Sequence, residues 1–175
     1  MALVTLKEIL RNTKVEKYAV GSYNAANHSM AEAVLDVSEQ LGLPVILGVA
    51  EVHFRYLNLE RFARYLHQRI AGMTTPVALH LDHGLGLESI WRALDLGFSS
   101  VMIDASNCPY DENVALTSKT VERAASYGAS VEAELGKVGG GEGNLEQGTS
   151  ADTAGYTDPE QAKRFVESTG MTPWP

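Results

Sequence analysis

The chain has 175 residues, of which 45% are hydrophobic and 21% charged, as expected for one globular domain that buries a full core. Its formal net charge of −8 excludes the basic surface that nucleic-acid and anionic-membrane partners require. Cys108 is the single cysteine, which excludes an internal disulfide, and with no signal-peptide or membrane-span pattern we expect a cytoplasmic protein.

The predicted elements alternate between helices and strands along the chain. Thr5 with Glu8 forms a capping-box pattern, which predicts a short helix ending at about Arg11. Strands are predicted over 18–23, 45–49, 77–82, 100–104 and 130–135. Apolar residues at helical spacing predict helices within 30–41, 59–70, 87–94, 111–127 and 159–169, the last framed by Asp158 and Gly170.

Five alternating units of this kind predict an α/β fold with a parallel sheet, which closes either as a flat doubly wound sheet or as a barrel. In the third strand, Leu79 and Leu81 share one face while His80 and Asp82 occupy the other. A sheet covered by helices on both faces would be apolar throughout, so one polar face favours a (β/α)8 TIM barrel. The chain is then expected to hold about the first five β/α units in 1–170, followed by an aberrant or truncated tail over 171–175.

Three successive strands end on side chains that bind metals or titrate. Asp82 and His83 end the third strand, Asp104 ends the fourth, and Glu134 lies near the end of the fifth. The carboxyl ends of barrel strands form the face where barrel enzymes carry their chemistry, so these side chains are expected to converge. Imidazole and carboxylate groups are ligands for divalent metals, and we therefore expect a metal site at this rim.

Each of these residues also has an ordinary structural interpretation. His83 is either a metal ligand or a loop histidine that caps a helix. Asp82 is a ligand, a general base, or an acceptor for the following loop. Asp104 and Glu134 are either ligands, groups that orient a ligating histidine, or helix-capping acids.

The sequence also allows predictions for a buried polar pair and for a glycine-rich stretch. His80 and Glu132 lie one layer deeper than the rim, where a mutual hydrogen bond is expected because neither is cheaply buried alone. The glycine-rich stretch 139–143 lacks the spacing of a nucleotide-binding motif, which favours a mobile active-site loop carrying Glu142.

Four motifs of the chain are recognisable as a set: Leu79-His80-Leu81-Asp82-His83, Met102-Ile103-Asp104-Ala105-Ser106, Val131-Glu132-Ala133-Glu134-Leu135-Gly136 and Tyr156-Thr157-Asp158-Pro159. With these motifs the chain closely resembles the class II, zinc-dependent ketose-bisphosphate aldolases, which include the fructose-1,6- and tagatose-1,6-bisphosphate enzymes. The resemblance runs from about Thr5 to Gly170 in the family's order and spacing.

The resemblance implies a β/α barrel that reversibly splits a ketose bisphosphate into dihydroxyacetone phosphate and glyceraldehyde 3-phosphate, with Zn2+ polarising the ketone. His83 matches the first of three zinc histidines, and Asp104 and Glu134 match carboxylates of an alternative or second metal position. Asp82 matches the acid that exchanges a proton with the substrate's C4 hydroxyl. The remaining matched positions are Glu142, a loop acid for proton transfer at carbon, and the substrate-contacting Asn24 and Ser106.

The chain also departs from the family pattern. The family's other two zinc histidines and its phosphate-binding glycine segments are expected beyond the end of this chain, and Gly48-Val49-Ala50 lacks a serine found in many fructose-specific members. We therefore expect this chain to be inactive alone, with a non-catalytic remnant or a stabilising partner of a full-length aldolase as the alternative. The full-length family is expected to form homo-oligomers.

Overall fold

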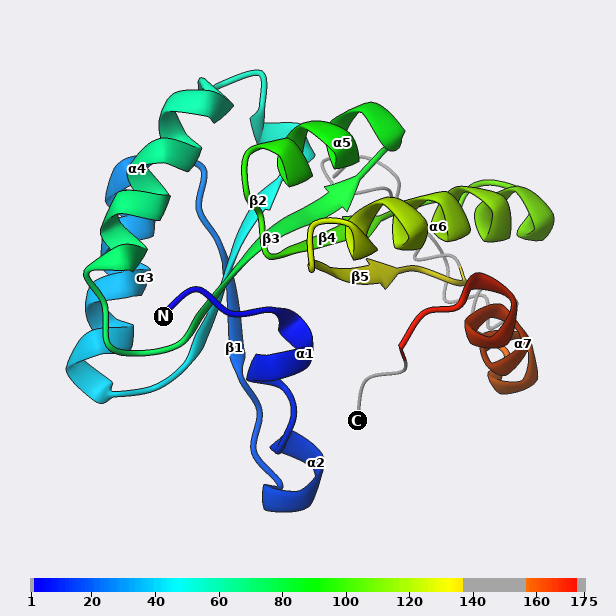
Figure 1. Cartoon of the computed structure of the whole chain (residues 1–175), viewed down its shortest axis with the longest axis horizontal. Helices are drawn as coiled ribbons and strands as arrows, with labels where there is room; N and C mark the ends of the chain where they lie inside the picture. Colours follow the sequence, from blue (N-terminus) through cyan, green and yellow to red (C-terminus); the bar gives the residue numbers. More distant parts are fainter. Residues whose placement is uncertain (1, 137–156, 173–175) are drawn as a thin grey trace, which may run out of the picture.

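The computed structural model describes residues 2–136 and 157–172 (Figure 1). The strands are β1 (Gly21–Asn24), β2 (Val45–Ala50), β3 (Val77–Gly84), β4 (Ser100–Ile103) and β5 (Ser130–Ala133). The helices are α1 (Leu6–Ile9), α2 (Thr13–Glu16), α3 (His28–Leu41), the 3-10 turn η1 (Glu51–His53), α4 (Leu59–Ala71), α5 (Leu87–Asp95), α6 (Tyr110–Ala125) and α7 (Pro159–Thr169).

The five strands form one parallel sheet in the order β1-β2-β3-β4-β5, so each strand pairs with the next strand of the sequence. Such an order is produced by successive right-handed β/α units and is the arrangement of a barrel rather than of a doubly wound sheet, whose strand order reverses. In Figure 1 the sheet twists strongly from β1 to β5, with α3 to α6 around its outer side and α1 on its inner side. The predicted barrel-type fold is confirmed.

The two faces of the sheet pack against different partners. Alternate strand residues that face the helices, such as Leu79 and Leu81 of β3, belong to the main hydrophobic core together with the buried sides of α3 to α6. The opposite residues form a second, smaller cluster in which Ile46 and Ala78 pack against Leu6 of α1. The alternation expected for β3 is therefore confirmed, and the small inner cluster leaves the carboxyl-end rim to polar residues.

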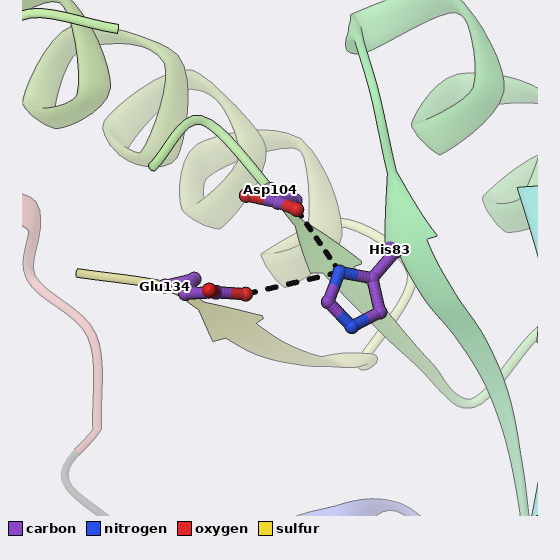
Figure 2. A group of neighbouring side chains, drawn as sticks. All are labelled: His83, Asp104 and Glu134. Carbon is purple, nitrogen blue, oxygen red and sulfur yellow. Dashed lines mark hydrogen bonds and ion pairs between the residues drawn. The ribbon is translucent and has the colours of Figure 1, made fainter. Parts of the chain in front are cut away.

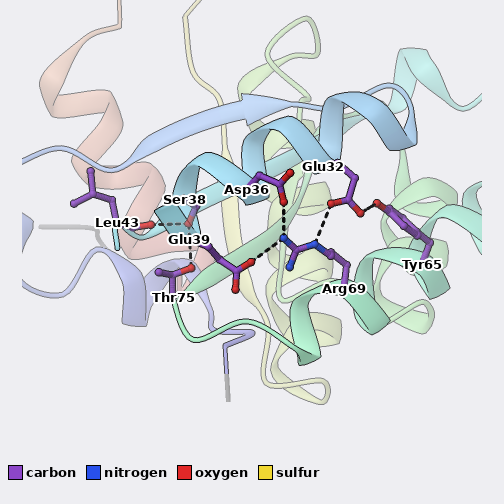
Figure 3. Close-up of polar contacts among 8 residues, drawn as sticks. All are labelled: Glu32, Asp36, Ser38, Glu39, Leu43, Tyr65, Arg69 and Thr75. Carbon is purple, nitrogen blue, oxygen red and sulfur yellow. Dashed lines mark hydrogen bonds and ion pairs between the residues drawn. The ribbon is translucent and has the colours of Figure 1, made fainter. Parts of the chain in front are cut away.

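A polar network joins α3 to α4 on the outer side of the sheet (Figure 3). Arg69 of α4 contacts three acids of α3: its Nε lies 3.0 Å from Glu32, and its Nη2 lies 2.8 Å from both Asp36 and Glu39. The Tyr65 hydroxyl donates a second hydrogen bond to Glu32, and burial followed by this contact raises the pKa of Tyr65 to about 12. The two helices are thus held in register by directional contacts as well as by the apolar core.

Several predicted boundaries are wrong. The helix expected to end at about Arg11 is α1 and ends at Ile9, the short helix α2 after it was not predicted, and the first strand starts at Gly21 rather than at Tyr18. The fifth strand ends at Ala133, so Glu134 follows it, and β3 continues to Gly84, so Asp82 and His83 lie within it. The helix predicted over 111–127 spans Tyr110–Ala125.

Among the described residues, the helices are too short or too polar to cross a bilayer.

Candidate metal centre

The rim of the sheet turns sharply at the end of β3. His83 has a left-handed backbone, with φ of +45°, which is uncommon for a residue other than glycine. The next residue is Gly84, where an added Cβ would lie 2.7 Å from both Ile90 Cδ1 and the Met102 carbonyl oxygen. The pairing of β3 with β4 shifts register between Leu81 and Gly84 at the same place. Close packing at Gly84 and the register shift thus direct the His83 side chain toward the end of β4.

His83, Asp104 and Glu134 converge at this rim from the ends of three successive strands (Figure 2). The His83 Nδ1 lies 3.0 Å from Asp104 Oδ2 and 3.7 Å from Glu134 Oε2. One donor atom from each residue lies within 4.8 Å of the other two, and all three side chains are half-buried. The expected convergence is confirmed. One imidazole nitrogen and two carboxylate oxygens form a donor set that suits a divalent cation such as Zn2+.

Asp104 is held in its charged form by its neighbours. Its Oδ1 accepts hydrogen bonds from the Ser106 backbone N–H, at 3.1 Å, and from the Ser106 hydroxyl, at 2.7 Å. Burial alone would raise the pKa of Asp104, but the Ser106 and His83 hydrogen bonds outweigh it and leave the pKa below its ordinary value. A carboxylate that stays ionised is the form that binds a cation. Ser106, expected to contact substrate, therefore contacts Asp104 in this structure.

Asp82 lies beside the cluster on the inner face and is bonded to a residue of a distant strand. The Asn24 Nδ2 donates a hydrogen bond of 2.7 Å to Asp82 Oδ2. Asp82 is half-buried, so its carboxylate is partly accessible from the inner side of the sheet. Asn24 and Asp82, for which the resemblance implies substrate contact and proton transfer, are thus brought together directly.

Below the rim, His80 occupies a buried layer on the inner face. Its Nδ1 lies 2.6 Å from the Ser100 hydroxyl, whereas its Nε2 lies 3.6 Å from Glu132 Oε2, too far for a hydrogen bond. The prediction of a hydrogen bond between His80 and Glu132 is therefore wrong, and the Ser100 hydroxyl is the hydrogen-bonding partner of His80 instead. Burial lowers the pKa of His80 to about 4, and burial followed by the Asp82 charge raises the pKa of Glu132.

A cavity of about 440 Å³ opens on this inner face, with His80, Asp82 and Glu132 among its polar lining residues. Leu6, Leu10, Ile46 and Met171 supply most of its apolar wall. Asp82 therefore borders this cavity, and its sequence neighbour His83 belongs to the rim cluster.

Glu142 and the glycine-rich stretch 139–143 lie outside the described residues. Two contributors to the site were not identified from the sequence: Ser100, which bonds His80, and Gly48, which lies beside Asn24. Ser100 is the first residue of the fourth strand and lies on the inner face. The alternation of side chains along strands, which placed His80 on that face, could have placed Ser100 there as well. Gly48 gives no sequence signal of its own, because a glycine within an apolar strand has several interpretations.

Comparison with known proteins extends this description. The family described as fructose-bisphosphate aldolase class-II matches residues 4–173. A fructose-bisphosphate aldolase of Staphylococcus epidermidis is 45% identical over 176 aligned residues, covering 98% of this chain and 59% of that protein. A probable fructose-bisphosphate aldolase of Bacillus subtilis is 43% identical, covering 98% of this chain and 60% of that protein. The crystal structure of the YdjI aldolase from Escherichia coli K12 superposes with a TM-score of 0.82 at 31% identity, over 97% of this chain and 59% of that one.

The sheet order places the chain in the class of β/α-barrel folds, and the rim cluster lies where the carboxyl ends of the strands meet. Within that class, the chain belongs to the class II fructose-bisphosphate aldolase family, whose profile covers nearly all of it. The chain spans about three fifths of the length of the relatives it matches.

Proposed function

We propose that this chain carries the metal-binding and proton-transfer part of an aldolase active site. The reaction is the reversible cleavage of a ketose 1,6-bisphosphate, fructose or tagatose, to dihydroxyacetone phosphate and glyceraldehyde 3-phosphate. The observation that carries the proposal is the convergence of His83, Asp104 and Glu134 within 4.8 Å at the carboxyl-end rim of a parallel sheet. Membership of the class II aldolase family supports the same reaction.

In this proposal His83, Asp104 and Glu134 hold the cation, which is zinc. A bound divalent cation supplies Lewis-acid polarisation of the substrate carbonyl. Ser106 keeps Asp104 ionised through its two hydrogen bonds, so the carboxylate is available as a ligand across the neutral pH range.

Asp82 exchanges a proton with the C4 hydroxyl of the substrate. Its carboxylate borders the inner cavity and is positioned by Asn24, and both features suit a general base that must reach a bound hydroxyl. Glu142 is proposed as the acid that assists proton transfer at carbon. Asn24 and Ser106 are proposed to contact substrate in addition to their contacts with Asp82 and Asp104.

We further propose that the 175-residue chain, studied by itself, binds zinc weakly and does not cleave the bisphosphate. The described residues offer a single histidine at the rim cluster, whereas catalytic zinc sites commonly use two or three histidines or thiolates. The phosphate-binding amides that position such substrates are not identified in this chain, and positioning accounts for a large share of catalysis.

A non-catalytic role as a stabilising partner of a full-length aldolase is the second candidate. It is favoured by an apolar groove of about 680 Å³ beside β1 and the outer face of α3. Tyr23, Val37 and Leu41 are more than half exposed there, and an exposed apolar patch beside a sheet edge is a common site of association.

Zinc calorimetry on the purified chain tests the metal site. We expect weak binding that His83→Ala and Glu134→Gln each abolish, while Glu60→Gln, a matched loss of charge on α4 at a residue that pairs with Arg92 and lies outside the cluster, leaves it unchanged. Equal zinc affinity in the wild type and the two cluster variants would refute the assignment of the ligands.

Turnover of fructose and tagatose 1,6-bisphosphate is then assayed with the chain alone and with the remaining segment of the Staphylococcus epidermidis relative added as a separate polypeptide. We expect cleavage only in the mixture. Metal-dependent turnover by the isolated chain would overturn its proposed inactivity. A chain that raises the thermal stability of a full-length relative without changing its turnover would favour the partner role.

A further inference from the structure

The hydrogen bond between Asn24 and Asp82 spans an intervening strand. Asn24 ends β1 and Asp82 lies in β3, and β2 separates these strands in the sheet. Neighbouring strands lie about 4.8 Å apart, so the two residues belong to strands separated by roughly 10 Å. Two short side chains can join across that distance only if the middle strand presents no bulky side chain between them.

Gly48 of β2 provides this space. It is in register with Asn24 on one side and with His80 on the other. A Cβ built on Gly48 would lie 2.2 Å from Asn24 Oδ1 and 3.2 Å from Asn24 Cγ, closer than packed atoms approach. Gly48 is not among the glycines with positive φ, so its backbone accepts any residue and the constraint is one of space.

The next inner-face residue of β2 is also small. Ala50 is in register with Asp82, so β2 presents only a hydrogen and a methyl group where the Asn24 side chain crosses. The chemistry of the contact is equally restricted. An ionised carboxylate only accepts hydrogen bonds, so the Asn24 amide must present its NH2 group to Asp82, which leaves the amide oxygen toward Gly48.

We propose that Asn24 and Gly48 form one positioning unit for Asp82, in which Gly48 keeps open the path through which the Asn24 amide fixes the carboxylate. This inference rests on the proposed role of Asp82 in proton transfer. The amide orients the carboxylate without adding a positive charge, and so it does not neutralise the base as a lysine or arginine would.

As a consequence, Gly48, which contacts no reacting group, affects the activity of Asp82, which does. Any side chain at position 48 displaces Asn24, and Asp82 then loses its orienting donor. A misplacement of about 1 Å in a reacting group lowers turnover by up to about 100-fold, whereas substrate affinity depends on other contacts. Gly48→Ala and Asn24→Ser are therefore expected to have the same effect, and the double variant no larger an effect than either alone.

The side-chain amide signals of Asn24 in a 15N-labelled sample of the whole chain provide the first test, which is independent of activity. Asp82→Ala and Gly48→Ala should each move these signals. Gly72→Ala is the matched control, because its added Cβ meets only the Arg69 carbonyl oxygen at 3.6 Å, an ordinary contact. Asn24 signals that do not respond to Gly48→Ala or to Asp82→Ala would overturn the positioning unit.

The second test measures kcat and KM in the reconstituted mixture described above. We expect kcat to fall ~10- to 100-fold in both Gly48→Ala and Asn24→Ser, and any rise in KM to be confined to Asn24→Ser, which also removes the proposed substrate contact. A rise in KM at unchanged kcat in both variants would leave Asn24 with its proposed substrate contact alone and overturn the positioning role. Asn24→Ser leaves β2 untouched, so it keeps the inference testable if Gly48→Ala does not fold. A wild-type chain that does not bind zinc would count against the proposed function but not against the contact between the Asn24 amide and Asp82.

Discussion

The two faces of β3 differ in what they do for the protein. Leu79 and Leu81 point toward the helices and are completely buried in the main core. His80 and Asp82, the residues between and after them, point inward, where they meet Ser100, Asn24 and the inner cavity. One strand therefore serves packing on one side and polar chemistry on the other, with the alternation of side chains keeping the two apart.

This difference shows why the polar side tolerates groups that a core would reject. The inner face has a much smaller apolar cluster, closed by the short helix α1, and its residues His80 and Asp82 keep hydrogen-bonding partners. Changes on the helix-facing side should therefore affect stability alone, whereas changes on the inner side should affect pH dependence, metal binding and turnover. The following predictions test that division.

The largest effect is expected on the helix-facing side. Leu79→Ala removes a fully buried side chain from the middle of the sheet and should lower the free energy of unfolding by about 3 to 5 kcal/mol. Urea denaturation followed by circular dichroism measures the loss. Leu41→Ala provides the control: Leu41 is 64% exposed at the end of α3, and a change below about 0.5 kcal/mol is expected there. A loss at Leu79 no larger than at Leu41 would contradict the division between the faces.

The next effect concerns pH and the inner face. Because burial lowers the pKa of His80 to about 4, the unfolded chain binds a proton at this residue that the folded chain does not. The contribution of His80 to stability is then fully present above about pH 6.5 and falls by about 3 kcal/mol as the pH drops toward about 4. The lowered pKa of Asp104 acts in the same direction but below this window, because an unfolded aspartate titrates only near pH 4.

Comparison with His80→Asn isolates the histidine, since asparagine can still bond the Ser100 hydroxyl but does not titrate. Urea midpoints measured at several pH values between about 4.5 and 7 should decline less steeply in this variant. Parallel pH profiles for the two proteins would show that His80 is not the group responsible.

A smaller effect is expected for the polar network between α3 and α4 (Figure 3). Arg69→Ala removes contacts to Glu32, Asp36 and Glu39 and leaves these three acids facing one another, so we expect a loss of about 1.5 kcal/mol. The loss should shrink in high salt, because the partners are partly exposed. Arg92→Ala, which breaks a more exposed pair with Glu60, should cost below about 0.5 kcal/mol. Equal losses for the two arginines would argue against a cooperative network.

The smallest effect is expected at α1, the cover of the inner cluster. Thr5 caps this helix through its side chain and forms a capping box with Glu8. Thr5→Ala should therefore cost about 1 kcal/mol, and Thr5→Ser should restore most of it. α1 packs on the inner face, where His80 is buried. If loss of the cap in Thr5→Ala lets water reach His80, the pKa of His80 rises toward its ordinary value, and the free energy of unfolding then depends less steeply on pH. Thermal unfolding of both variants at neutral and acidic pH measures the two effects.

The sequence was sufficient for the barrel-type architecture and for the three residues of the rim cluster. Strand alternation distinguished the two faces of β3, and the carboxyl ends of consecutive parallel strands meet by geometry, so His83, Asp104 and Glu134 could be predicted to converge. The resemblance added proposed roles for them, which remain predictions.

Other features depended on tertiary packing. The continuation of β3 through His83 needs a left-handed backbone and a register shift against β4, neither of which a local pattern reveals. The partner of His80 was predicted wrongly because Ser100 is in register with His80 on the adjacent strand β4, whereas Glu132 lies one strand further away, on β5. The contact between Asn24 and Asp82 crosses a strand, and local spacing carries no information about it.

The order of the strands also has a consequence for how the chain acquires its structure. Each strand pairs with the one that precedes it in the sequence, so during synthesis every new strand emerges beside an edge that already exists. Short sequence separations between partners favour rapid, stepwise folding from the first residues onward. Asn24 and Asp82 can meet once β3 has docked, whereas the rim cluster waits for β5 and Glu134. A nascent chain would therefore form the contact between Asn24 and Asp82 before the rim cluster, and hydrogen exchange on ribosome-bound intermediates could resolve that order.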